Sequence, residues 1–198
     1  MKRRVVALLM ATMMGAFCIT GCGSSKEATS DKAAKTEKEA DTESDKNADK
    51  KAADKVAALI DAIYVQERND KTDEQCAEAK EAWDALTDAQ KELVEGENAD
   101  PDYFGRDTGD ASKDDARNQD DIGENEILAV SFGTSFNDSR VADIKGIEDA
   151  LQEANPDWSV RRAFTAQIII NHVQARDGEK IDNVDQALER AVDNGVKN

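Results

Sequence analysis

The run Ile127–Phe136 constrains the fold of this chain more than any other feature, because its pattern is that of a buried strand ending in a tight polar turn. It begins with consecutive apolar residues, which is typical of a strand covered on both faces in an α/β sheet. Gly133 then allows the chain to turn sharply and to approach a ligand closely. Asn137 and Asp138 follow, and both are favourable at the start of a helix. We therefore predict a strand, a polar loop and a helix, and we interpret the earlier residues as delivery and spacing.

The residues after this run predict a strand–helix–strand unit with two further helices. A second strand is predicted over 159–164, and a right-handed crossover would make it parallel to the first. A helix is predicted over 167–175, closed by Gly178, and a last helix runs from a cap at Asp182 to Gly195. The first helix has an apolar face made of Val141, Ile144, Ile147 and Leu151. The predicted fold class is α/β, with the first βαβα part of a doubly wound parallel sheet.

The same arrangement predicts a site for an anionic group. A helix N-terminus offers free N–H donors and partial positive charge, and ligands of open α/β sheets bind at the carboxyl ends of the strands. The alternative is that Ser131 and Thr134 only satisfy the backbone of the turn. A serine hydrolase has no support, because the loop lacks the second glycine of a nucleophile elbow and the chain has a single histidine.

Residues 1–21 have the pattern of a bacterial lipoprotein signal peptide. Positive residues at the start precede an apolar run, Val5–Ile19, that is short for a bilayer-spanning helix. The following Ile19–Cys22 resembles a lipobox, in which Cys22 is lipidated after cleavage. Attachment of more than one acyl chain predicts stable anchoring at the extracytoplasmic face of the cell membrane. The alternative is an ordinary cleaved signal with an incidental cysteine.

Charge and cysteine usage exclude several classes of protein. The formal net charge of -17 argues against a nucleic-acid partner, and it favours either simple solubility outside the cell or a loose attraction for cations. Cys18 would leave with the signal and Cys22 would carry lipid, so Cys76 remains without an intramolecular partner. The sequence has no CxxC motif or Cys/His cluster, which argues against a structural zinc site.

Residues 22–52 are predicted to be a disordered, charged tether. No apolar side chain larger than alanine occurs between Gly23 and Val56, so this segment cannot bury enough surface to offset chain entropy. Its alanine, lysine and glutamate content would nonetheless permit transient helix.

Residues 53–95 are predicted to be a small helical hairpin, which resembles short helical modules of secreted proteins from Gram-positive bacteria. Apolar residues fall on one face of each helix, and Thr87–Gln90 has the form of a capping box. Trp83 is interpreted as a core residue rather than a platform for a ligand, and Cys76 as a small hydrophobic residue rather than a nucleophile. The apolar stripes are Val56, Leu59, Ile60 and Ile63, then Cys76, Ala79, Trp83 and Leu86.

Residues 96–126 are predicted to be an acidic linker, dense in aspartate. A calcium-binding loop was the alternative for two stretches. It fails at Phe104 in the first stretch, and at Ile122 and Ala129 in the second, because each stands where a ligand is required. We therefore predict a solvated spacer.

Several separate motifs in residues 127–198 resemble the N-terminal part of the anaerobic sirohydrochlorin cobaltochelatases. These motifs are Ser131–Ser135, Arg162–Thr165, Ile168–Ile170, Arg176–Gly178 and Ile181–Asp182. The resemblance implies two similar α/β halves with a tetrapyrrole in the cleft between them. It also implies an activity, the insertion of Co²⁺ into sirohydrochlorin in cobalamin biosynthesis, with Co²⁺ as a substrate rather than a cofactor held by this chain.

The resemblance implies a set of substrate-binding residues at the strand ends. Backbone N–H groups and hydroxyls of the first loop would meet the carboxylates of sirohydrochlorin or a related tetrapyrrole, and Arg162 would pair with one of them. The implied residues are Ser131, Phe132, Gly133, Thr134, Ser135, Arg162, Phe164 and Thr165. The same residues are compatible with homo-oligomers.

The resemblance assigns no catalytic or metal-binding residue to this chain. The histidines and the glutamate that the family uses for ligation and proton transfer lie in a C-terminal portion that these residues do not match. His172 lies outside the matching motifs, and we interpret it as an exposed or partly buried helix residue rather than a metal ligand. We expect an N-terminal fragment that is inactive alone. The alternative is a surface lipoprotein that binds haem, a corrinoid precursor or a metal ion with a chelatase-like fold.

Overall fold

The computed structural model describes residues 31–99 and 104–198, with side chains described from residue 45 onward. The predicted signal peptide and the predicted lipidation site, Cys22, lie outside the described residues. All contacts given below lie within one unit, Ala40–Asn198. Within the described part of the chain, no helix is both long enough and apolar enough to span a membrane.

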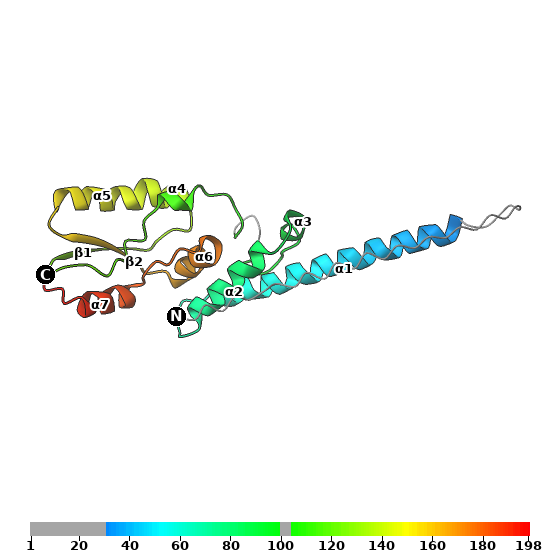
Figure 1. Ribbon diagram of the computed structural model, residues 1–198, viewed down its shortest axis with the longest axis horizontal. Helices are drawn as coiled ribbons and strands as arrows, with labels where there is room; N and C mark the ends of the chain where they lie inside the picture. Colours follow the sequence, from blue (N-terminus) through cyan, green and yellow to red (C-terminus); the bar gives the residue numbers. More distant parts are fainter. Residues whose placement is uncertain (1–30, 100–103) are drawn as a thin grey trace, which may run out of the picture. The chain divides into compact units, whose positions relative to one another are not determined.

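Helix α1, Asp31–Ile63, is longer than the sequence predicted (Figure 1). The hairpin was expected to begin at residue 53, after a disordered tether, but one helix continues through that boundary. The prediction of disorder is therefore wrong for residues 31–52. The physical reason is that alanine, lysine and glutamate have high helix propensity, and the apolar turns near Ile60 continue the same helix without a break.

Residues 45–99, the helical module, have an apolar core. Helix α1 is followed by α2, Thr72–Asp84, and by the short α3, Asp88–Lys91. The predicted capping box is confirmed, because the Thr87 side chain accepts from the Gln90 backbone and the Gln90 side chain accepts from Thr87. Trp83 is buried and meets Phe104 edge-on, with 5.1 Å between the ring centroids, which agrees with its interpretation as a core residue. The core also contains Val56, Ile60, Ile63, Cys76, Ala79 and Val94.

The predicted parallel strand pair is present. Strands β1, Glu126–Ser131, and β2, Ser159–Phe164, pair in parallel with Glu126 opposite Ser159 and Ser131 opposite Phe164. On the other edge of β1, the backbone N–H of Glu126 donates to the carbonyl of Asn198. The amide of Lys197 donates in turn to the carbonyl of Glu124. The described sheet thus has two strands, with a short extended segment beside the start of β1.

Helices lie on both faces of this sheet, as expected for a doubly wound fold (Figure 1). The helix after β1 consists of α4, Asn137–Ser139, a π-helical turn η2, Arg140–Ile144, and α5, Lys145–Ala154. Helices α6, Gln167–Asp177, and α7, Val184–Asp193, lie on the opposite side.

The ends of α6 and α7 test the predicted caps. Gly178 closes α6 in the left-handed conformation, at φ 77°, as predicted. Gly195 follows α7 at φ 69°, also as predicted. The N-terminal cap of α7, however, is Asn183 rather than Asp182. The carboxylate of Asp182 instead accepts from the buried Arg161, so it is engaged as a counter-ion.

The α/β domain, residues 104–198, buries charged groups where the helical module buries apolar ones. Three of its largest fully buried side chains are Arg140, Arg161 and Arg162, each with no exposed surface. Each of the three is paired with carboxylates. By contrast, the predicted apolar face of the first helix is only partly used, since Ile147 is 65% exposed.

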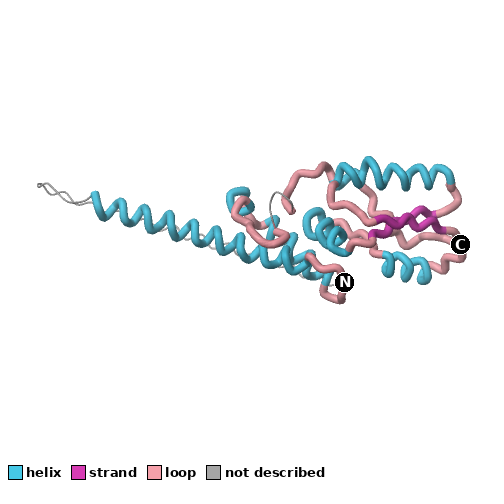
Figure 2. Tube along the Cα trace, turned by 180° about the vertical axis from the view of Figure 1, so that it is seen from behind, coloured by secondary structure: helices cyan, strands magenta, loops and turns pink. Residues whose placement is uncertain are grey.

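Residues 104–124, which we call the acidic strap, are not the solvated spacer that the sequence predicted. Figure 2 shows them as loop over most of their length, with one 3₁₀ turn at Ala111–Lys113. Phe104 and Ile122 are buried, and the carboxylate of Asp114 has no exposed surface. The high aspartate content suggested solvation, but one of those carboxylates is needed inside the domain as a counter-ion.

Helix α6 is one of the elements through which the helical module contacts the α/β domain, and Phe104, which meets Trp83, is another. The Asn171 side-chain amide donates to the carbonyl of Ile63, at 2.7 Å, and the Gln174 amide donates to Asp73, at 2.9 Å. Ala175 lies in the apolar core of the module. These contacts explain why α6 is buried almost all round and shows no single apolar face.

Candidate functional site

Gly133 makes the turn after β1, as predicted from its position. Its φ is 93°, a conformation that other residues rarely adopt. A Cβ atom built there would meet the Phe164 ring at 2.4 Å. Glycine is therefore needed at this position because the Phe164 ring, at the end of β2, lies so close to it. The loop after β1 thus packs against the end of the neighbouring strand.

The polar residues of this loop mostly face the protein. The Thr134 hydroxyl accepts from the backbone N–H of Phe136, at 3.1 Å, so it stabilises the turn itself. Ser135 is buried, and its carbonyl accepts from Arg176 at 2.6 Å and from Arg140 at 3.5 Å. The Ser131 hydroxyl is buried without a hydrogen-bond partner among the described residues. Two arginines therefore position the loop by holding one carbonyl.

An exposed apolar surface adjoins the loop. Phe132 is 70% exposed, although it directly follows a strand, and Val130 and Phe136 are also exposed. An exposed aromatic ring beside such a loop is accessible to a ligand or a protein. Phe132 is thus the predicted site residue that is most accessible to a flat aromatic ligand.

The end of β2 opens into a cavity of about 400 Å³. The exposed Thr165 and the otherwise buried Phe164 lie on its wall, together with Gln167 at the start of α6. Arg68, from the connection between α1 and α2, also lines this cavity. The helical module therefore contributes to the surface at the strand ends, which the sequence did not predict.

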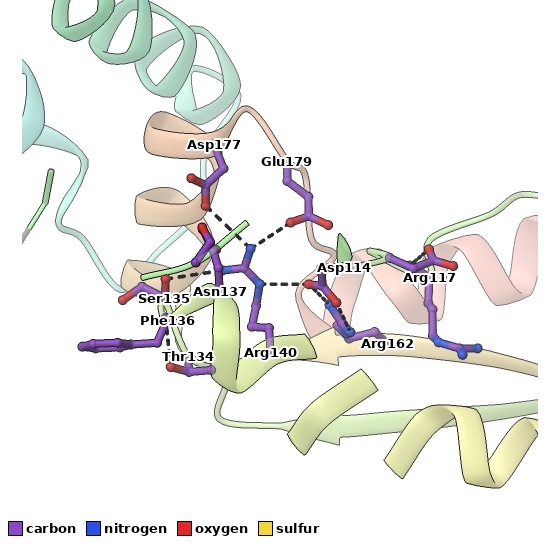
Figure 3. A network of polar contacts seen from close by, with 12 residues as sticks. Asp114, Arg117, Thr134, Ser135, Phe136, Asn137, Arg140, Arg162, Asp177 and Glu179 are labelled. Carbon is purple, nitrogen blue, oxygen red and sulfur yellow. Dashed lines mark hydrogen bonds and ion pairs between the residues drawn. The ribbon is translucent and has the colours of Figure 1, made fainter. Parts of the chain in front are cut away.

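Arg162 lies in the interior rather than at the cleft surface (Figure 3). Its guanidinium donates to both oxygens of Asp114, at 2.7 and 3.0 Å, and to both oxygens of Glu148, at 2.9 and 2.8 Å. All three side chains are almost completely buried. The predicted pairing of Arg162 with a substrate carboxylate is therefore not what the structure has, because two internal carboxylates take its donors.

Arg140 extends the network to the loop after β1 (Figure 3). Its Nε donates to Asp114 at 2.9 Å, and its Nη2 donates to Glu179 at 3.0 Å. A third contact reaches the Ser135 carbonyl. Asp114 thus joins two buried arginines, one from β2 and one from the helix after β1.

The backbone donors at the start of that helix are occupied as well. The N–H of Asn137 donates to the Thr108 hydroxyl, at 3.2 Å, and the N–H of Asp138 donates to the Thr108 carbonyl, at 2.7 Å. The sequence predicted these donors for an anionic ligand. In the structure, the acidic strap takes them.

Electrostatics within the network follow from burial and pairing. Burial alone would raise the pKa of Asp114, but hydrogen bonds from Arg162 and Arg140 hold that pKa below its ordinary value. Burial raises the pKa of Glu179, and the nearby Asp114 carboxylate raises it further. Asp114 is therefore the firmly ionised carboxylate between the two arginines.

His172 is buried between the helical module and the α/β domain. Tyr64 approaches its Nδ1 at 2.8 Å, and Phe104 stacks on its ring with 5.0 Å between centroids. Burial lowers the pKa of His172 to about 4, and the nearby Arg176 adds to this effect. His172 lies in a helix, as interpreted, but it is fully buried, whereas the sequence suggested an exposed or partly buried position, because Tyr64 and Phe104 cover it. Within residues 45–99 and 104–198, no group of three potential ligand side chains is arranged to hold a metal ion.

Comparisons with known proteins connect this site to a family. Residues 125–198 match the model of the cobalt chelatase (CbiK) family. The sirohydrochlorin cobaltochelatase of Salmonella typhimurium is 39% identical over 71 residues, which are 36% of this chain and 27% of that protein. No solved structure matches the chain significantly. The resemblance seen in the sequence motifs is confirmed for this C-terminal segment, as an N-terminal portion of the family, and the segment spans about a quarter of the relative's length.

Sequence reasoning missed four residues of the network, Asp114, Arg140, Glu148 and Glu179. Asp114 stands in a stretch of many aspartates and lies outside the family match, so nothing in its neighbourhood distinguishes it. Arg140 stands in the helix after the loop, next to the apolar Val141. An arginine beside an apolar helix position is a weak signal of burial, and it becomes useful only when a carboxylate partner is known.

Proposed function

We propose that residues 125–198 form the tetrapyrrole-facing opening part of a sirohydrochlorin cobaltochelatase, an enzyme that inserts Co²⁺ into sirohydrochlorin. The observation that carries the proposal is the family match over the segment that contains both strand ends. The parallel register supports it, because it brings the Gly133 loop and the Phe164–Thr165 end of β2 to the same edge of the sheet.

The exposed groups at this edge suit a flat, carboxylated ligand. Phe132 offers an aromatic face to the solvent, and the exposed Thr165 lies on the wall of the adjoining cavity. Stacking on Phe132 would supply apolar contact, while hydroxyl and backbone donors would meet carboxylates at the ring's periphery. These residues bind and orient the ring, and they perform no proton transfer.

The described residues provide little for the chemical step. Metal insertion needs a ligand for the incoming Co²⁺ and a base for the pyrrole N–H protons. His172 is 1% exposed, and burial keeps its pKa near 4. We therefore expect the 198 residues to bind sirohydrochlorin without inserting Co²⁺ faster than the spontaneous reaction.

Binding and insertion are tested by one titration followed by one time course. Quenching of sirohydrochlorin fluorescence would report binding, and absorbance after the addition of Co²⁺ would report insertion. Phe132→Ala is expected to weaken binding about tenfold, whereas Ile147→Ala, at an exposed position of similar character on α5, is the matched control. Absence of any binding to the wild-type chain would refute the proposal, and rapid insertion would refute the assignment of roles.

A second candidate is a surface lipoprotein that captures a tetrapyrrole, such as haem or a corrinoid precursor, without acting on it. The exposed Phe132 and Thr165 at the strand ends support this candidate, because they could bind a ring. Residues 45–99 and 104–198 contain no group of side chains arranged to hold a metal ion. Titration with haem and with sirohydrochlorin, followed by addition of Co²⁺, separates the two candidates.

We also propose that the chain is anchored through lipid on Cys22. The support is the sequence pattern of residues 1–22. Metabolic labelling with a fatty-acid analogue should mark the wild-type chain and not Cys22→Ser, whereas Cys76→Ser, which alters a buried cysteine, should leave labelling unchanged.

A further inference from the structure

We propose that the acidic strap, residues 104–124, is an internal competitor that occupies a carboxylate-binding site formed by Arg140 and Arg162. A carboxylated ligand at the loop after β1 would bind these arginines only after the strap has moved aside. The inference rests on the proposed function, because it takes the tetrapyrrole's carboxylates as the competing groups.

Arg140 and Arg162 already bind a carboxylate with the geometry expected of an anion-binding site. Arg162 and Arg140 make three hydrogen bonds to Asp114, at 2.7, 3.0 and 2.9 Å. Two of them form a bidentate pair, the geometry in which arginine recognises planar anions. Asp114 belongs to the strap, whereas Arg140 and Arg162 belong to η2 and β2. The carboxylate could therefore leave the arginines without any movement of the elements that carry them.

The strap lies against the start of the helix that follows the Gly133 loop. Thr108 accepts from the backbone N–H groups of Asn137 and Asp138, directly after the loop that the family match includes. Arg140 donates both to Asp114 and to the Ser135 carbonyl of that loop. The strap therefore occupies two adjacent sets of donors beside the loop, and it meets them with oxygen acceptors that a ligand carboxylate could replace.

Arg140 and Arg162 have carboxylate partners other than Asp114. Arg162 keeps both oxygens of Glu148, and Arg140 keeps Glu179 at 3.0 Å. Each buried arginine would therefore retain at least one carboxylate partner when the strap leaves, and Arg140 would retain Asp177 at 3.6 Å as well. An incoming carboxylate would restore the charge balance that Asp114 gives.

The strap is also built so that its middle can separate while its ends stay fixed. Phe104 and Ile122 are buried at the two ends, and most residues between 105 and 115 are exposed. Gly109 adopts φ 105°, and a Cβ atom there would lie 2.0 Å from the Asp138 carboxylate. The strap thus turns at Gly109 in close contact with the helix start, at a point where glycine also permits other conformations.

The competing interpretation is that Asp114 is only a structural counter-ion. A structural role predicts that its removal lowers stability and leaves ligand affinity unchanged or reduced. Competition predicts that its removal raises affinity, because the apparent dissociation constant falls as the competent fraction rises. The two interpretations therefore differ in the sign of the effect.

The test is a titration of full-length variants with uroporphyrin, a stable polycarboxylated tetrapyrrole. Asp114→Asn keeps the side-chain shape and removes the charge, and it should tighten binding at least tenfold. Asp121→Asn makes the same change at an exposed position of the strap and should stay within twofold of the wild type. Asp114→Asn binding no tighter than the wild type would overturn the proposal.

A second variant covers the case in which Asp114→Asn does not fold. A protease site placed at the exposed Ser112 allows the strap to be cut after folding, and cutting should raise uroporphyrin affinity in the same direction. Unchanged affinity after complete cleavage would also overturn the proposal. If the wild type binds uroporphyrin and neither change tightens binding, only the strap inference fails. If no form binds it, the proposed function fails as well.

Discussion

The helical module and the α/β domain solve the problem of a small interior in different ways. The module buries apolar side chains such as Ile60 and Trp83. The domain buries arginines with carboxylates around a two-stranded sheet, and only a small apolar cluster accompanies them. An apolar interior loses stability in proportion to the volume removed, whereas an ionic interior loses most stability when a buried charge is left without any partner. Residues before the family match therefore belong to the interior of the α/β domain, and Asp114 is the main example because it pairs with two buried arginines.

The largest expected effect is in the ionic interior. Arg162→Ala leaves the carboxylates of Asp114 and Glu148 buried without their main partner, and we expect it to lower the free energy of unfolding by about 4 kcal/mol. Urea denaturation followed by circular dichroism measures it. Arg106→Ala, at an exposed position, is the control. A loss below about 1 kcal/mol for Arg162→Ala would show that the network is not a unit, by comparison with the usual cost of breaking a buried pair.

A somewhat smaller effect is expected in the apolar interior. Ile60→Ala removes a fully buried side chain from the helical module and should destabilise by about 3 kcal/mol, independently of pH. Val65→Ala, at a position that is 41% exposed, is the matched control. If the loss for Ile60→Ala changed strongly between pH 5 and pH 8, the distinction between the two interiors would not hold.

The boundary between the two regions should respond to acid through His172. Its pKa is lowered from the ordinary value to about 4, so the unfolded chain binds more protons between these values and stability falls as pH decreases through this range. We expect a loss of about 2 kcal/mol between pH 7 and pH 4.5 from this group. Denaturant midpoints measured across this range should show a smaller slope for His172→Gln. An identical slope would contradict the assignment.

The smallest expected effect concerns the start of α7. Asn183→Ala removes a capping box whose side-chain oxygen accepts from the Gln186 backbone at 2.9 Å, and we expect a loss of about 1 kcal/mol. Asp182→Asn, in contrast, weakens a buried partner of Arg161 and should cost more. Thermal unfolding of both variants compares them, and the reverse order would restore Asp182 as the cap.

The sequence was sufficient for the local elements of the matched segment. The apolar run at Ile127, the turn at Gly133 and the closing Gly178 each depend on one or two neighbouring residues, so their patterns can be read directly. The family match and the parallel register confirm the fold class that these patterns predicted.

The sequence was insufficient where a side chain acts over a long separation. Arg162 was predicted to face a substrate because it follows the pattern of the family, yet its partner Asp114 comes from an unmatched segment. The aspartate-rich composition predicted that the strap would be solvated, but composition cannot single out Asp114, the aspartate whose carboxylate is buried. The burial of α6 depends in the same way on contact with the helical module.

In the proposed competition, the strap and a carboxylated ligand exclude each other at Arg140 and Arg162. Hydrogen–deuterium exchange of residues 105–116, with and without saturating uroporphyrin, measures this most directly. We expect the strap peptides to exchange faster when the ligand is bound, because Thr108 and Asp114 have moved away from Asn137, Asp138 and Arg140. Slower or unchanged exchange in the strap at saturation would contradict the account.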